Sequence, residues 1–202
     1  MKLLKTFSVC ALMLGAVVTG NAQMGTMEPS FGVKGGVNFA NVTGDDFGDQ
    51  ESRTSFHVGV LAEFPLAEIF SLQVEALYSG QGFRTNIPGG LFGGDDRVEY
   101  HLDYINVPVL AKVYLIEGLS LEVGPQFGFK VNEKIDFDPT SDDGDWGMGE
   151  AKDFDFGIAA GVSFSTQMGL FATGRYVMGV TEVVDNMDAK NSVFQIGIGY
   201  KF

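Results

Sequence analysis

The sequence predicts an all-β fold, namely an eight-stranded antiparallel up-and-down transmembrane β-barrel with short periplasmic turns and long extracellular loops. Apolar residues alternate with glycine or polar residues over eight segments, which is the pattern of strands that have one apolar face. Short and long polar connections alternate between these segments, as in the barrels of bacterial outer membranes. No run of about 18 apolar residues occurs, which argues against a helical membrane protein.

The first 22 residues predict a signal peptide, which leaves residues 23–202 as the barrel domain. Lys2 and Lys5 give a positive start, residues 7–18 form a short apolar core, and a small-residue cleavage pattern follows. An uncleaved membrane anchor is the alternative, and we disfavour it because the apolar run is too short to span a membrane.

Charge and cysteine content narrow the possible partners and chemistry. The formal net charge is −13, and loss of Lys2 and Lys5 with the signal peptide takes it to −15. This balance argues against nucleic acid as a partner, because phosphate binding needs basic patches. Cys10 is the only cysteine and lies within the signal peptide, so the mature chain has none for a disulfide, a metal site or a nucleophile.

Four strands are expected in the N-terminal half, with apolar faces over Val33–Phe39, Phe56–Phe64, Phe70–Tyr78 and Ile105–Leu115. The first is the weakest of them, because glycines stand on both of its faces. In the other three, aliphatic or aromatic residues occupy every second position, which predicts strands with one buried or lipid-facing side.

Four further strands are expected in the C-terminal half, with apolar faces over Leu119–Val131, Phe154–Phe164, Leu170–Met178 and Phe194–Phe202. The seventh strand is weaker than its neighbours, because Phe171 and Val177 fall on its otherwise polar face. Pro108 and Pro125 each remove a donor from the hydrogen-bond ladder. We therefore expect a bulge or a weakened pair beside each proline.

The connections and the aromatic residues indicate how the barrel sits in a membrane. Short connections are predicted at 65–69, 116–118 and 165–168, and long polar ones at about 43–53, 84–98, 135–152 and 181–191. Tilted strands of about ten residues match the thickness of the hydrocarbon layer. Two interfacial aromatic girdles are expected, with Phe64, Phe70, Phe164, Tyr200 and Phe202 at the short-turn end and Phe39, Phe56, Tyr78, Phe129, Phe154 and Tyr176 at the long-loop end.

The second face of the strands distinguishes a membrane barrel from a soluble, lipocalin-like barrel. In the soluble alternative the apolar face lines a ligand cavity and the second face meets water. That second face is rich in glycine and has only isolated charges, which suits a filled lumen better than a soluble exterior. We expect its ions to form a buried network, which is tolerable only if its partners and hydrogen bonds are complete. These ions are Lys34, Glu63, Glu75, Lys112, Glu122, Lys130 and Arg175, and Lys201 shares their face.

Acidic residues crowd the four predicted long loops, and the third loop is the richest. Oxygen-rich clusters can hold calcium, but this loop lacks the spacing of a helix–loop–helix calcium site and contains Pro139. We therefore expect a solvated surface loop, with no metal and no cofactor. Trp146, the only tryptophan, lies in this loop. We expect it to pack against its own loop or to lie at the lipid interface. The alternative is that it contacts an extracellular partner.

Four polar residues near the long-loop end raise an enzymatic alternative. His57, Ser79, His101 and Asp103 are expected at inward or rim positions, where a Ser–His–Asp arrangement could support acyl transfer. No nucleophile-elbow motif marks the serine, and polar rim residues often have structural roles. No glycine-rich phosphate loop precedes a helix, so nucleotide binding has little support. We therefore expect a protein without enzymatic activity.

Short motifs along the mature chain resemble the PorT-like outer-membrane β-barrel family. Tyr104–Lys112 resembles a strand of that family in which a tyrosine, an aliphatic–proline step and a lysine follow in this order. Phe31–Asn38 resembles its opening strand and Gly174–Tyr176 its penultimate strand. Tyr200 and Phe202 resemble the aromatic C-terminal signal read by the barrel-assembly machinery. The resemblance implies a small Gram-negative outer-membrane barrel and carries over no catalytic residue.

The expected function is a non-enzymatic outer-membrane scaffold that displays acidic extracellular loops for surface interaction or membrane integrity. A narrow channel for small solutes or ions is one alternative, although eight strands normally leave room only for their own side chains. A rim-located lipid hydrolase or acyltransferase is the other. The expected partners are outer-membrane lipids and, during biogenesis, the barrel-assembly machinery, and the sequence does not identify an extracellular partner.

Overall fold

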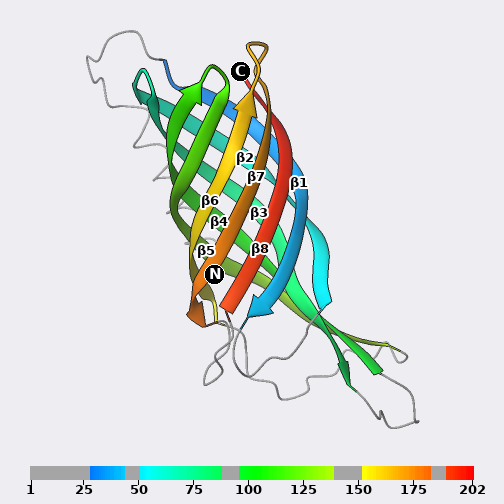
Figure 1. The fold of residues 1–202 in the computed structure, drawn as a ribbon. Coiled ribbons are helices and arrows are strands. Elements are labelled where there is room, and N and C mark those ends of the chain that lie inside the picture. The colour runs from blue at the N-terminus through cyan, green and yellow to red at the C-terminus, as the bar shows by residue number, and fades with distance from the viewer. Residues whose placement is uncertain (1–27, 44–50, 88–95, 139–151, 183–189) are drawn as a thin grey trace, which may run out of the picture.

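The computed structural model describes residues 28–43, 51–87, 96–138, 152–182 and 190–202. Eight antiparallel strands follow one another around a closed barrel, and the first pairs with the last to close it (Figure 1). This confirms the predicted eight-stranded up-and-down barrel. The strands are β1 (Ser30–Thr43), β2 (Glu51–Ala67), β3 (Phe70–Ile87), β4 (Asp96–Ile116), β5 (Leu119–Asp138), β6 (Phe154–Ser165), β7 (Leu170–Glu182) and β8 (Lys190–Lys201).

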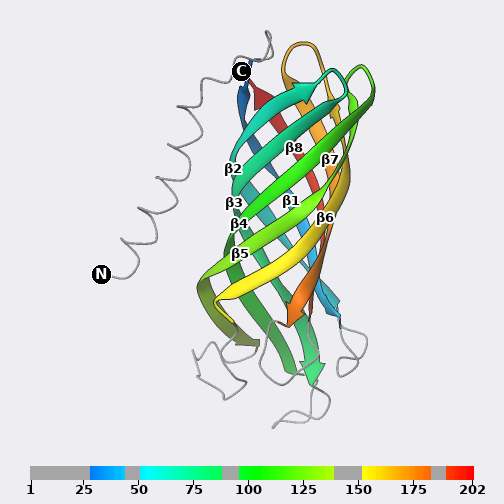
Figure 2. The same ribbon diagram turned by 90° about the vertical axis from the view of Figure 1, so that its left-hand side faces the viewer.

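Three short turns join β2 to β3, β4 to β5 and β6 to β7 at one end of the barrel (Figures 1 and 2). Gly118 and Gly169 in two of these turns have φ angles of 82° and 89°, a backbone conformation that glycine adopts without steric cost. β1 begins and β8 ends at this same short-turn end, where Gly32 pairs with Lys201. The other four connections lie outside the described residues, so the predicted long loops and the position of Trp146 stay predictions.

Strands β3, β4 and β5 are longer than predicted and project beyond their neighbours at the end opposite the short turns (Figure 2). A connection was expected at 84–98, but β3 extends to Ile87 and β4 begins at Asp96. β5 extends to Asp138 and pairs with β4 throughout, whereas β6 begins only at Phe154. In β4 the apolar positions change face between Tyr104 and Ile105, so the extension does not continue the alternation that marks residues 105–115, although backbone pairing continues.

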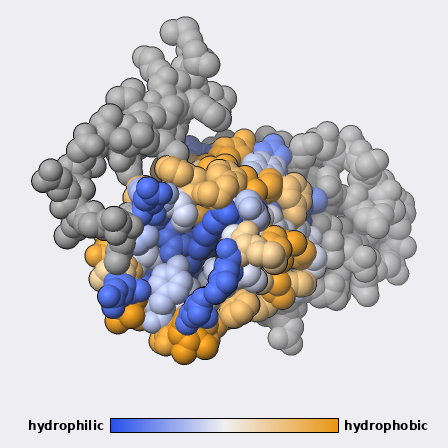
Figure 3. All heavy atoms as spheres, turned by 90° about the horizontal axis from the view of Figure 1, so that it is seen from above, coloured by the Kyte–Doolittle hydropathy of each residue, from blue (hydrophilic) through white to orange (hydrophobic). Residues whose placement is uncertain are grey.

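The outward side of the barrel is apolar along all eight strands, as predicted. Figure 3, which views the molecule from the short-turn end, shows hydrophobic side chains on the wall and hydrophilic ones toward the centre. Aromatic rings contact each other across neighbouring strands near the projecting end. The ring centroids are 5.9 Å apart for Phe56 and Tyr78 and 5.6 Å apart for Phe129 and Phe154. Each contact joins two of the predicted girdle residues on neighbouring strands.

Pro108 and Pro125 weaken the sheet without changing its register. The β3–β4 pairing skips the position of Pro108, and the β4–β5 pairing skips the position of Pro125. The register is the same on both sides of each gap. Of the two expected outcomes, the structure therefore has the weakened pair and not the bulge, because a missing N–H donor removes a bond without adding a residue.

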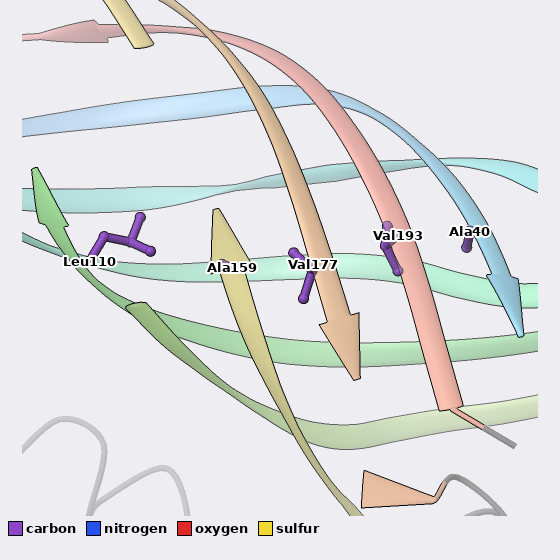
Figure 4. Close-up of a cluster of buried hydrophobic side chains, with 5 residues drawn as sticks. All are labelled: Ala40, Leu110, Ala159, Val177 and Val193. Atoms are coloured by element: carbon purple, nitrogen blue, oxygen red, sulfur yellow. The ribbon is translucent and has the colours of Figure 1, made fainter. Parts of the chain in front are cut away.

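The lumen is filled by inward side chains, and an apolar patch lies among the polar ones. Val177, which interrupts the polar face of β7 in the sequence, belongs to this patch and is buried. Four of its members follow one line of paired residues from β6 through β7 and β8 to β1. The patch consists of Ala40, Leu110, Ala159, Val177 and Val193 (Figure 4).

Candidate functional site

The candidate functional site is the group of charged side chains that the strands turn into the lumen. Each occupies an inward position of the two-residue alternation, so its partners must come from the lumen itself. Burying a charge away from water costs several kcal/mol, which makes paired and fully hydrogen-bonded partners necessary. Six of the predicted residues are buried: Lys34 on β1, Glu63 on β2, Glu75 on β3, Lys112 on β4, Glu122 on β5 and Arg175 on β7.

Arg175 is the centre of this arrangement and is 0 % exposed. Its Nη1 and Nη2 donate to the two carboxylate oxygens of Glu75 at 2.8 and 2.7 Å, and its Nε donates to Oε1 of Glu122 at 2.7 Å. Lys34 lies farther away, with Nζ 3.5 Å from Oε2 of Glu75. Two cations thus face two carboxylates, and among the described residues Oε2 of Glu122 has no hydrogen-bond partner, so the hydrogen bonds of this cluster are not complete. Because β3 and β7 are opposite strands of the ring, the two-pronged bond from Arg175 to Glu75 crosses the lumen.

A glycine on β6 makes room for the contact between Arg175 and Glu122. Gly161 is paired with Glu122 on one side and with Arg175 on the other. A Cβ atom on Gly161 would lie 3.0 Å from Cα of Arg175 and 3.1 Å from Oε1 of Glu122. The missing side chain therefore lets the guanidinium pass over the intervening strand. Glycine within a strand commonly marks such a close approach.

A second cluster surrounds Glu63 near the short-turn end. Nζ of Lys112 and Nζ of Lys201 donate to its Oε2 at 3.2 and 2.5 Å. The Ser71 hydroxyl donates to its Oε1 at 2.6 Å, and the Tyr114 hydroxyl donates to the same oxygen. Four donors on one carboxylate satisfy its acceptor positions, which is the condition for keeping this charge in the lumen.

Gln73 connects the two clusters. Its side-chain oxygen accepts a hydrogen bond from Lys112 at 3.1 Å, and its side-chain nitrogen donates to Oε1 of Glu75 at 2.5 Å. Sequence reasoning placed Gln73 on the inward face of its strand but did not select it as part of the network. The only signal was that inward position, since the search was for charged residues. The result is a continuous chain of polar contacts along the lumen.

Lys130 lies apart from both clusters, contrary to the expectation that it joins the network. It is half-buried toward the projecting end of β5, and its Nζ is 3.6 Å from an oxygen of the exposed Asp153. Its backbone N–H also donates to the Asp153 carbonyl. Alternation along the strand shows which face Lys130 occupies, but not its height in the barrel, and its height is what separates it from the buried glutamates.

His57 and Ser79 are both buried in the lumen and are paired across β2 and β3, but each is hydrogen-bonded to Asn38. Oδ1 of Asn38 lies 2.7 Å from Nδ1 of His57, and Nδ2 of Asn38 donates to the Ser79 hydroxyl at 2.9 Å. Asn38 therefore bonds both residues in place of the imidazole–hydroxyl contact that activates a serine nucleophile.

His101 and Asp103 lie toward the projecting end of β4, as expected, but their side chains do not point into the lumen. Both alternate along β4 with buried residues at 102 and 104, so they lie on the outer side of that strand. Nδ1 of His101 is 2.5 Å from Nη2 of Arg53, and Oδ2 of Asp103 accepts from Asn132 at 3.1 Å. The geometry therefore does not bring Asp103 to His57 or Ser79 as a triad.

Tyr200 and Phe202, the residues of the predicted assembly signal, both face outward at the short-turn end. Their ring centroids are 6.3 Å apart, and the backbone N–H of Phe202 donates to the Phe31 carbonyl at 2.8 Å. This contact fastens the last residue to β1.

No helix within the described ranges is long and apolar enough to cross a membrane. The same ranges contain no group of three or more histidine, aspartate or glutamate side chains arranged to hold a metal ion. Most of the acidic loop residues considered for calcium lie outside the described residues or have side chains that the structure does not describe.

A closed barrel with an apolar wall and an ion-filled lumen has the architecture of a transmembrane β-barrel protein. Residues 21–185 match the family described as the outer membrane protein beta-barrel domain, and the chain belongs to this family. It is therefore an outer-membrane β-barrel protein. No curated protein matches it in a sequence comparison.

Several solved structures of outer-membrane proteins are similar to this chain at low sequence identity. Neisserial surface protein A is 13 % identical with a TM-score of 0.53, and the match covers 87 % of this chain and 99 % of that one. Ail of Yersinia pestis, crystallised in complex with the heparin analogue sucrose octasulfate, is 15 % identical with a TM-score of 0.49, over 87 % and 100 %. OprG of Pseudomonas aeruginosa is 14 % identical with a TM-score of 0.47, over 87 % and 97 %.

Proposed function

We propose that this chain is a non-enzymatic outer-membrane scaffold, whose sealed barrel presents acidic loops outside the membrane for surface interaction or membrane integrity. The observation that carries the proposal is the bond between Arg175 and Glu75 across the lumen. Both side chains are fully buried, so a solute path at this level would have to break a two-pronged, charge-assisted contact. Eight strands leave little space beyond what these side chains fill.

The projecting strands support the display role. β3, β4 and β5 continue as a paired three-stranded sheet beyond the level at which β6 begins, and they end in the acidic connections. In bacterial barrels the long connections face outward and the short turns face the periplasm. On that rule the projecting sheet stands outside the cell, where it holds its loops away from the membrane surface.

The three motifs that resemble the PorT-like family support membership of that narrower group. Each contributes one cation to the lumen: Lys34 from the first motif, Lys112 from the second and Arg175 from the third. All three contact glutamates of the network. We infer that the cations at these motif positions hold the lumen closed. We also infer that assembly uses the aromatic C-terminal signal together with the barrel-assembly machinery.

Conductance separates the scaffold from the channel alternative. The purified barrel in planar lipid bilayers should give no discrete conductance steps at moderate voltage, and reproducible steps would favour a narrow channel.

The lipid composition of cells tests the enzymatic alternative. Cells that express Ser79→Ala or His57→Ala should have the same lipid A and phospholipid profiles as cells that express the wild type. A changed lipid A or phospholipid profile would instead favour the rim enzyme.

Protease treatment of intact cells tests the orientation. Cleavage should fall within residues 139–151 while the outer membrane is intact, because the long connections are expected outside. Cleavage only after the outer membrane is ruptured would reverse the orientation and remove the display role.

A further inference from the structure

An apolar groove of about 660 Å³ lies on the outer wall of the barrel near the short-turn end. It crosses from the end of β6 over β7, β8 and β1 to β2, and Figure 1 shows β7, β8 and β1 side by side on the facing side of the barrel. Its volume falls in the range of roughly 300–1,000 Å³ that small-molecule sites occupy. The groove is thus the size of a site for a small molecule.

Side-chain size alternates along a line of paired residues on the groove floor, from which we infer a depression on either side of one protruding side chain. Ile198 on β8 is paired with Gly35 of β1 on one side and with Ala172 of β7 on the other. Because both neighbours are small, Ile198 is 71 % exposed. Val58 and Phe164 form the outer walls, since they pair with Gly35 and Ala172 respectively. Each depression lies one interstrand spacing, about 4.8 Å, from Ile198.

Packing within the chain does not explain the glycine in this groove. A Cβ atom on Gly35 would meet its nearest neighbours at 3.6 and 4.0 Å, which is ordinary van der Waals contact. The inward-facing Gly36 differs, because a Cβ there would lie 2.6 Å from Cα of Gly197. A larger apolar residue would therefore fit at position 35, where outward strand positions usually carry one. No contact within the described residues therefore requires a glycine at position 35.

We propose that this groove seats one diacyl glycerophospholipid, with an acyl chain in each depression beside Ile198. The groove is continuous with the apolar wall that contacts the membrane, so hydrocarbon chains reach it directly. Two depressions divided by one side chain match two chains tethered to one glycerol. Tyr200 lines the groove at the short-turn end, where it offers a hydroxyl group to the ester and headgroup region. A stable interface with a second barrel would bury about 1,600 Å² in total. A second barrel would therefore have to cover much more of the wall than this groove.

Native mass spectrometry of the mature barrel tests this seat. The protein is released from detergent that contains phosphatidylethanolamine and phosphatidylglycerol, and the lipids that stay bound are counted. Wild type should keep one diacyl phospholipid at collision energies that remove all others. The double variant Gly35→Val/Ala172→Leu fills both depressions and should weaken retention at least about tenfold. Ala111→Leu enlarges an outward alanine on β4, outside the groove, and should leave retention unchanged.

Further comparisons separate the possible outcomes. A lysophospholipid, which has one acyl chain, should be retained at least about tenfold less well than the diacyl lipid. Ile198→Ala, which removes the divider without adding bulk, should also weaken diacyl retention and serves if the double variant does not fold. Three results would each overturn the proposal. The Gly35→Val/Ala172→Leu variant could retain the diacyl lipid as well as wild type does, or wild type could retain the one-chain lipid equally well. Wild type could also form a dimer that the double variant does not form. The sealed-scaffold function is judged separately by conductance.

Discussion

Replacing Arg175 with methionine would test whether the luminal network holds the barrel together. In the central cluster Arg175 and Lys34 face Glu75 and Glu122. The substitution keeps much of the side-chain length but leaves two buried carboxylates with one ammonium, 3.5 Å from one of them. Removing one partner of a buried ion pair costs about 3–5 kcal/mol, because an uncompensated charge stays buried. The loss should lie toward the upper end, since three hydrogen bonds disappear together.

Urea unfolding in phospholipid vesicles measures this loss, with heat-modifiable gel mobility reporting the folded fraction. The matched variant Arg175→Met/Glu122→Gln restores charge balance, because Lys34 and Glu75 are left as one pair. It should recover about half of the lost free energy of unfolding, or roughly 1.5–3 kcal/mol of coupling between the two positions. Unfolding of Arg175→Met within about 1 kcal/mol of wild type, or a further loss on adding Glu122→Gln, would refute the charge-balance reasoning.

Three further substitutions test other parts of the barrel in the same unfolding assay. Gly161→Val should lower the free energy of unfolding by about 1–3 kcal/mol, because the added side chain overpacks the lumen. In the control Gly174→Ala the new Cβ would meet only one side-chain atom at 4.0 Å, so the change should stay within about 0.5 kcal/mol. Equal effects of the two substitutions would contradict the role of Gly161. Glu63→Gln should cost about 3 kcal/mol because it leaves two lysines without a counter-charge, and Glu117→Gln in an exposed turn should cost less than about 0.5 kcal/mol. Val58→Arg places a charge on the outer wall and should cost about 2–4 kcal/mol in vesicles; a neutral result would mean that this wall does not face lipid.

The strand count and the two faces of each strand were predictable from the sequence. Alternation is a local property, because successive side chains point to opposite sides of a sheet whatever the strand pairs with. Residues 119–131 therefore showed their outward face before any partner strand was known, and the isolated ions between apolar positions could be assigned to the lumen. The fold class and the membrane context followed from the same pattern. An apolar face on every strand must contact either lipid outside the barrel or an enclosed cavity within it.

Which inward residues meet was decided only by the closed barrel. Arg175 reaches Glu75 from a position 100 residues away in sequence, and Gly161 must lie between it and Glu122. Alternation gives the face of a residue but not its height, so Lys130 was grouped with ions that it does not meet. Height depends on the stagger between strands that closure imposes on the whole ring. For the same reason, neither the asparagine that bonds both His57 and Ser79 nor the two depressions inferred beside Ile198 could be read from the order of residues alone.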